Sequence, residues 1–95
     1  MKKLGEAFAQ NTAGFDVQMA PNPATSVVTI NYTASAKMPT SVHVLDVEGV
    51  TVLSLDLGIQ QNGSTQISID KLASGVYIVE LTFGSDKVVR RLVKE

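Results

Sequence analysis

Cysteine and tryptophan are both absent from this chain of 95 residues. The lack of cysteine excludes disulfide bonds, thiolate ligands for a metal ion and a cysteine nucleophile. No apolar run in the sequence approaches the length of about 20 residues that a membrane-spanning helix needs. Apolar residues nevertheless make up 44% of the chain, which is too many for a disordered protein. The composition therefore predicts a single folded domain with a modest hydrophobic core.

Basic residues are scarce in the body of the chain and concentrated near its end. Residues 4–86 contain two basic and eight acidic side chains, a net charge of −6. Residues 1–3 contribute +2 and residues 87–95 contribute +3, so the whole chain has a net charge of −1. A nucleic-acid-binding protein needs a broad basic face, and none is indicated. We therefore expect no nucleic-acid partner, and the basic C-terminal segment requires another explanation.

The first 14 residues lack the apolar region that a signal peptide requires, because Gly5 and Glu6 interrupt it. We therefore interpret residues 1–14 as a linker or an added, non-native segment. No internal repeat and no low-complexity stretch occurs in the sequence.

From Phe15 onward, short runs rich in Val, Ile, Thr and Leu alternate with turn residues, and no stretch has a sustained helical period. This pattern predicts an all-β protein. The seven predicted strands are residues 15–20, 26–33, 41–47, 51–57, 64–70, 75–83 and 86–94. Seven short antiparallel strands predict an immunoglobulin-like Greek-key sandwich.

Four connections between these strands have recognisable signals. Pro21-Asn22-Pro23 is expected to end the first strand, because its two prolines remove two backbone donors. Residues 34–39 are expected to form a loop, and Asn62-Gly63 is a strong turn signal. Between the third and fourth strands, Asp46 can accept bonds from nearby backbone amides, and Gly49 is predicted to have a positive φ.

Leu72, Gly75 and Tyr77 resemble a tyrosine corner, in which the tyrosine hydroxyl bonds to an upstream backbone group. An ordinary core tyrosine is the alternative. Strand alternation also predicts the inward-facing side chains, since successive residues point to opposite faces. The predicted core consists of Val28, Ile30, Tyr32, Val42, Val44, Leu53, Leu55, Ile67, Ile69, Tyr77, Val79 and Leu81.

The sequence contains no evident catalytic group. Its one histidine, His43, lies three positions from Asp46, so the two side chains point to opposite faces of a strand. Ser41 shares the face of His43, but no third group completes a catalytic arrangement. The acidic residues are not spaced like a calcium loop, and no glycine-rich phosphate loop is present. We therefore expect neither enzymatic activity nor a metal ion or cofactor.

The last predicted strand is both apolar and basic. Alternation places Val88, Arg90, Leu92 and Lys94 on one face, and Lys87, Val89, Arg91 and Val93 on the other. Both faces are mixed, so neither can be fully buried without leaving a charge unsolvated. Two interpretations remain open from composition alone. The charges protect a sheet edge from other strands, or they form an address that another protein recognises.

Residues 19–30, 42–52 and 72–95 resemble a known family, the type A C-terminal sorting domains of type IX secretion found in Bacteroidetes cargo proteins. The resemblance covers residues 15–95, and it departs at Ala20, where the family often has an aromatic residue. The positions that match the family motifs and turns are Pro21, Asn22, Pro23, Asp46, Gly49, Leu72, Gly75 and Tyr77.

The resemblance implies that residues 15–95 direct an N-terminally attached cargo protein through the outer-membrane translocon. It further implies transit through the periplasm, removal by a sortase-like protease within Gly5–Gly14, and delivery to the cell surface or beyond, without direct insertion into a membrane. The segment recognised by the translocon would be Lys87, Val88, Val89, Arg90, Arg91, Leu92, Val93, Lys94 and Glu95. The alternative is an immunoglobulin-like structural or adhesion module beside a surface protein.

Overall fold

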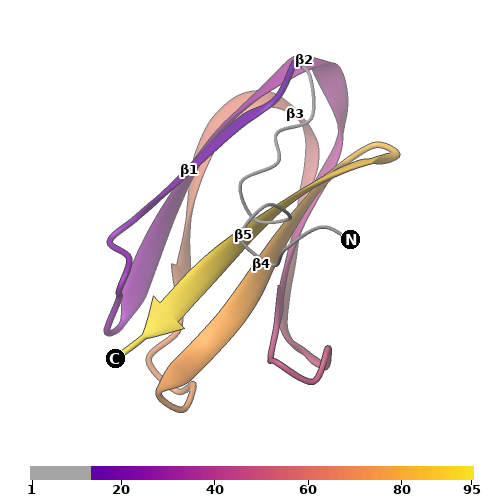
Figure 1. The fold of residues 1–95 in the computed structure, drawn as a ribbon. Coiled ribbons are helices and arrows are strands. Elements are labelled where there is room, and N and C mark those ends of the chain that lie inside the picture. Colours follow the sequence, from indigo (N-terminus) through magenta and orange to yellow (C-terminus); the bar gives the residue numbers. More distant parts are fainter. Residues whose placement is uncertain (1–13) are drawn as a thin grey trace, which may run out of the picture.

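The computed structural model describes residues 14–95, which form five antiparallel strands (Figure 1). The strand order is β1-β2-β4-β5, and β3 also pairs with β2. Within the described range there is no helix that could cross a membrane. The strands are β1 (Asp16–Ala20), β2 (Val27–Leu45), β3 (Thr51–Ser68), β4 (Gly75–Phe83) and β5 (Asp86–Lys94).

The prediction of an antiparallel all-β fold is confirmed, but the number of strands is five rather than seven. The strands predicted at 26–33 and 41–47 are both part of β2, and those at 51–57 and 64–70 are both part of β3. The first half of β2 lies between β1 and the second half of β3. Its second half lies between β4 and the first half of β3. β2 therefore runs through the whole structure and pairs with β1 at one end, with β4 at the other and with β3 along both.

The loop predicted at residues 34–39 is wrong, because β2 continues through it as a bulge. Thr33 pairs with Asn62, whereas the next pair is Met38 with Gln60, so several residues of β2 face a single residue of β3. Extra residues on one strand bend it and increase its twist. The sheet consequently curls into a half-barrel (Figure 1). The immunoglobulin-like Greek-key sandwich is not confirmed, since residues 14–95 form one curled sheet.

The turn predicted at Asn62-Gly63 is also wrong, and Tyr32 explains why a glycine is present. Gly63 lies within β3 and pairs with Tyr32. A Cβ atom at position 63 would lie 2.5 Å from the Tyr32 Oη atom and 2.7 Å from its Cζ atom. The Tyr32 hydroxyl donates a 3.4 Å hydrogen bond to Gln60 Oε1, and burial raises the pKa of this phenol. The glycine therefore permits close approach of a ring to the backbone.

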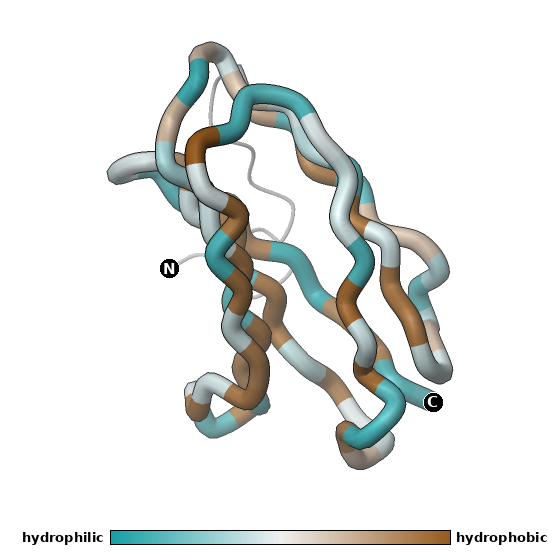
Figure 2. Tube along the Cα trace, turned by 180° about the vertical axis from the view of Figure 1, so that it is seen from behind, coloured by the Kyte–Doolittle hydropathy of each residue, from teal (hydrophilic) through white to brown (hydrophobic). Residues whose placement is uncertain are grey.

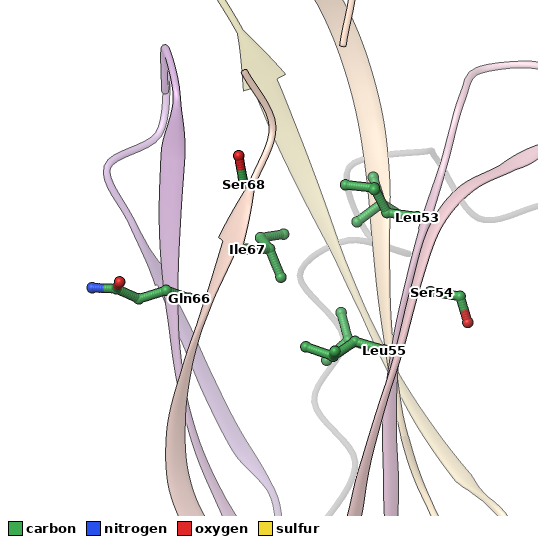
Figure 3. Close-up of a pocket in the computed structure, with 8 residues that line it drawn as sticks. Leu53, Ser54, Leu55, Gln66, Ile67 and Ser68 are labelled. Atoms are coloured by element: carbon green, nitrogen blue, oxygen red, sulfur yellow. The ribbon is translucent and has the colours of Figure 1, made fainter. Parts of the chain in front are cut away.

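Ten of the twelve predicted core residues are buried, and hydrophobic and polar residues alternate along the strands (Figure 2). The exceptions are Leu53, which is half-buried, and Leu55, which is 38% exposed. Both point toward Ile67 across the open side of the curl (Figure 3). Within residues 14–95 an apolar groove stays open here between the two halves of β3. Strand alternation correctly predicted that Leu53 and Leu55 point inward. At this edge of the sheet, however, an inward-pointing side chain stays partly exposed.

We expect Leu81→Ala to lower the free energy of unfolding by about 2–5 kcal/mol, because Leu81 is fully buried. Leu55→Ala removes the same atoms from a half-covered position and is expected to cost about 1 kcal/mol or less. Urea unfolding followed by circular dichroism compares the two variants. Equal losses of stability in the two variants would contradict the inference that Leu55 lies on an open side of the curled sheet.

Candidate functional site

The terminal strand is an integral part of the sheet. β5 pairs with β4 along its whole length, from Gly75 opposite Lys94 to Phe83 opposite Asp86. On its inner face, Val88 is 2% exposed and Leu92 is fully buried. Burying these two side chains in the core stabilises the strand in its place.

Arg90 lies between these two buried residues on the inner face and is only half-buried. It is opposite Val79, and its Nη1 atom donates a 3.0 Å hydrogen bond to the Val89 carbonyl. Long basic side chains commonly cover apolar surface with their stems while the charged end stays near water. The predicted alternation of faces on β5 is thus confirmed by burial, with Val88 and Leu92 inside.

The outer face of β5 presents charge above half-buried valines. Lys87 and Arg91 are exposed, whereas Val89 and Val93 are partly covered. Lys87 Nζ lies 3.6 Å from Glu80 Oε1, with the lysine side chain 53% exposed, so this ion pair contributes little to stability. Within residues 14–95 the guanidinium of Arg91 has no hydrogen bond or ion-pair partner.

Asn22 holds the outer edge of the terminal strand. Its Nδ2 atom donates a 2.9 Å hydrogen bond to the Arg91 carbonyl, and its Oδ1 atom accepts a 3.0 Å bond from the Val93 amide. The side-chain amide therefore pairs with β5 as the backbone of a neighbouring strand would. Pro21 and Pro23 flank it, and neither can donate a backbone hydrogen bond.

Ala24 extends the same contact by two backbone hydrogen bonds. Its amide donates to the Val93 carbonyl at 2.9 Å, and its carbonyl accepts from the Glu95 amide at 2.8 Å. Ala24 is buried and forms a parallel bridge with Lys94. We call these bonds of Asn22 and Ala24 to β5 and Glu95 the terminal clasp. Figure 1 shows the turn between β1 and β2 beside the end of β5, near the C-terminus.

The predicted Asp46–Gly49 turn is confirmed. Gly49 has a φ of 87°, and its amide donates a 3.0 Å hydrogen bond to the Asp46 carbonyl. The Asp46 Oδ1 atom accepts bonds from the amides of Glu48 at 2.9 Å and Val50 at 3.0 Å. The carboxylate and the glycine together define this connection between β2 and β3.

The tyrosine corner is confirmed as well. The Tyr77 hydroxyl donates a 2.7 Å hydrogen bond to the Ala73 carbonyl, four residues upstream. Leu72 is half-buried and packs against the core, and its amide bonds to the Ile69 carbonyl at 3.0 Å. Gly75 begins β4 opposite Lys94. These motif positions therefore fix the start of β4 beside the end of β5.

Two hollows lie away from the terminal strand. An apolar groove of about 260 Å³ lies between the halves of β3, where Leu53, Leu55 and Ile67 meet (Figure 3). A second hollow, of mixed polar and apolar lining, contains Ser41, His43 and Asp56. Within residues 14–95, His43 makes no hydrogen bond to a hydroxyl or a carboxylate, and no cluster of metal-ligating side chains was found. Neither hollow shows the contacts of a nucleophile, a base and an orienting acid.

Comparison with known families gives one match. The model of the family described as "Secretion system C-terminal sorting domain" matches residues 18–95, which include β2–β5 and the terminal clasp. No curated protein matches this chain.

Asn22→Ala is expected to increase the rate of amide hydrogen exchange at Val93 by about tenfold, because the amide loses its acceptor. Asn62→Ala changes an exposed asparagine on β3 and serves as the matched control. Exchange measured by nuclear magnetic resonance, residue by residue, distinguishes the two. An unchanged Val93 amide would show that the clasp does not hold the strand in solution.

Gly49→Ala is expected to reduce the free energy of unfolding by about 1–2 kcal/mol, the usual cost of a left-handed backbone at a residue with a Cβ atom. A Cβ atom at this position would meet nothing within 4 Å, so collision is not the cause. Glu48→Ala, in the same turn, leaves the backbone preference nearly unchanged. Thermal unfolding of both variants tests whether the positive φ of Gly49 requires a glycine. Equal stabilities of the two variants would show that it does not.

Proposed function

Because the chain belongs to the secretion system C-terminal sorting domain family, we propose that residues 15–95 act as the address of a secreted protein whose cargo precedes them. Membership in this family implies a C-terminal sorting signal that the type IX machinery recognises, and export to the cell surface or the extracellular space. The proposed boundary near residue 15 is supported by Phe15, whose ring stacks on Phe83 with centroids 4.9 Å apart.

We assign recognition to the terminal segment, Lys87–Glu95. The observation that carries this assignment is the contrast between the two edges formed by β5 and β3. The outer edge of β5 is already covered at its C-terminal end by the clasp, yet five of its nine residues are charged. β3 pairs only with β2 within the described range, yet only Asp56 is charged among its 18 residues.

Charges that protect a sheet edge belong on an edge that another strand could reach. Two of the five charged residues of β5, Arg91 and Lys94, lie where the clasp already covers the edge, so edge protection does not account for them. Recognition by a partner explains them better, because charge on a surface determines which partners bind and in what orientation.

The other motif positions support recognition indirectly. Pro21, Asn22 and Pro23 form the turn that holds β5, while Leu72, Gly75 and Tyr77 fix the start of its partner strand. Asp46 and Gly49 shape the hairpin between β2 and β3. These residues build the scaffold that displays the address, and the partner need not touch them.

The proposed route continues as in the family. The domain crosses the periplasm attached to its cargo and is recognised there by the outer-membrane translocon. A sortase-like protease then removes it as the cargo is anchored at the surface. The proposed cleavage region, Gly5–Gly14, lies almost wholly outside the described residues.

The test is a reporter that carries a periplasmic export signal and is fused in front of the complete 95-residue chain. In a type IX-competent bacterium we expect the reporter at the cell surface or in the medium. In a strain lacking the translocon it is expected to remain in the periplasm. The reporter without the chain is the control. An identical distribution in both strains would favour an adhesion or structural module instead.

A further inference from the structure

We propose that the partner recognises β5 through the side chains of its outer face rather than by adding a strand to its edge, and that this partner is an acidic protein surface. The inference rests on the proposed function and specifies how the address is recognised. Three observations support it: the state of the edge, the exposure of the face and the distribution of charge.

The C-terminal half of the β5 edge is closed to an added strand. The Arg91 carbonyl and the Val93 amide are bonded to Asn22, and the Val93 carbonyl and the Glu95 amide are bonded to Ala24. Nearer the start of the strand, the Val89 carbonyl accepts a bond from Arg90 Nη1. Strand addition requires a row of unpaired backbone groups, and the second half of this edge does not offer one.

The outer face of the same strand is open. Arg91 is exposed at its centre, and its guanidinium has no hydrogen bond or ion-pair partner within residues 14–95. Ile78 lies opposite it on β4, and Val89 and Val93 lie on either side along β5, all three partly exposed. A cation surrounded by half-buried apolar side chains matches the composition of recognition surfaces, in which arginine is enriched.

The charge of the rest of the domain orients the partner. Residues 4–86 have a net charge of −6, whereas residues 87–95 have a net charge of +3. An acidic partner is repelled by most of the domain and attracted to its terminal strand, so a wrong orientation is disfavoured before contact. A basic partner would instead be drawn to the body of the domain, away from the segment to be recognised.

Asn22 is, in this arrangement, a positioning residue. It is uncharged, and its side-chain amide hydrogen-bonds to the backbone of Arg91 and Val93. It therefore holds in place the segment of β5 that displays Arg91 without contributing to the outer face itself. This role predicts opposite effects of its removal under the two modes of recognition.

Charge variants of the reporter fusion test the face. Arg91→Glu is expected to lower type IX-dependent surface delivery by about tenfold, because like charges then meet at the contact. Arg91→Lys keeps the charge and is expected to retain most of the delivery. Lys37→Glu is the matched control, since it makes the same charge change at an exposed residue of β2. Circular dichroism and thermal unfolding confirm that each variant is folded.

Asn22→Ala tests whether the partner adds a strand to the edge of β5. It frees the Arg91 carbonyl and the Val93 amide, so recognition by strand addition predicts unchanged or increased delivery. Recognition of the outer face predicts a decrease, because the segment that carries Arg91 is held less firmly. Unchanged or increased delivery of Asn22→Ala, or equal delivery of Arg91→Glu and Lys37→Glu, would overturn this inference while the unchanged chain is still exported. Failure of the unchanged chain to be exported would overturn the proposed function itself.

Discussion

The contact between the turn after β1 and the last strand is the constraint on which the rest of the structure depends. Asn22 and Ala24 make four hydrogen bonds to β5 and to Glu95 beyond it. The asparagine amide replaces a strand backbone at a place where two flanking prolines could not donate a hydrogen bond. Without this contact, β5 would be held by β4 on one side and by its two buried side chains alone.

The bend in β2 makes this contact geometrically possible. Because β2 is continuous, its first half pairs with β1 while its second half pairs with β4. The bulge between Thr33 and Met38 turns the strand from one side of the curl to the other. The same curl leaves the groove at Leu55 and Ile67 uncovered. The bend in β2 therefore has two results: the turn after β1 reaches the edge of β5, and the groove along β3 stays uncovered.

Local features of this fold could be predicted from the sequence, and features that join distant segments could not. The turn at Gly49 and the hydroxyl bond of Tyr77 each depend on a few neighbouring residues, and both were predicted correctly. Asn22 and Arg91 are 69 positions apart, and no local pattern indicates that they meet. Gly63 was misinterpreted because a glycine under an aromatic ring and a glycine in a turn look alike in sequence.

The separation of the two sides of the clasp along the chain also determines when the clasp can form during folding. Residues 22–24 are synthesised about 70 residues before their partners Arg91, Val93 and Glu95. Contacts over such separations form late in folding, since closing the long intervening segment costs entropy. A chain that lacks residues 91–95 leaves Asn22 and Ala24 without their hydrogen-bond partners on the last strand. The terminal clasp is therefore complete only after both of its sides, residues 22–24 and residues 91–95, have been synthesised.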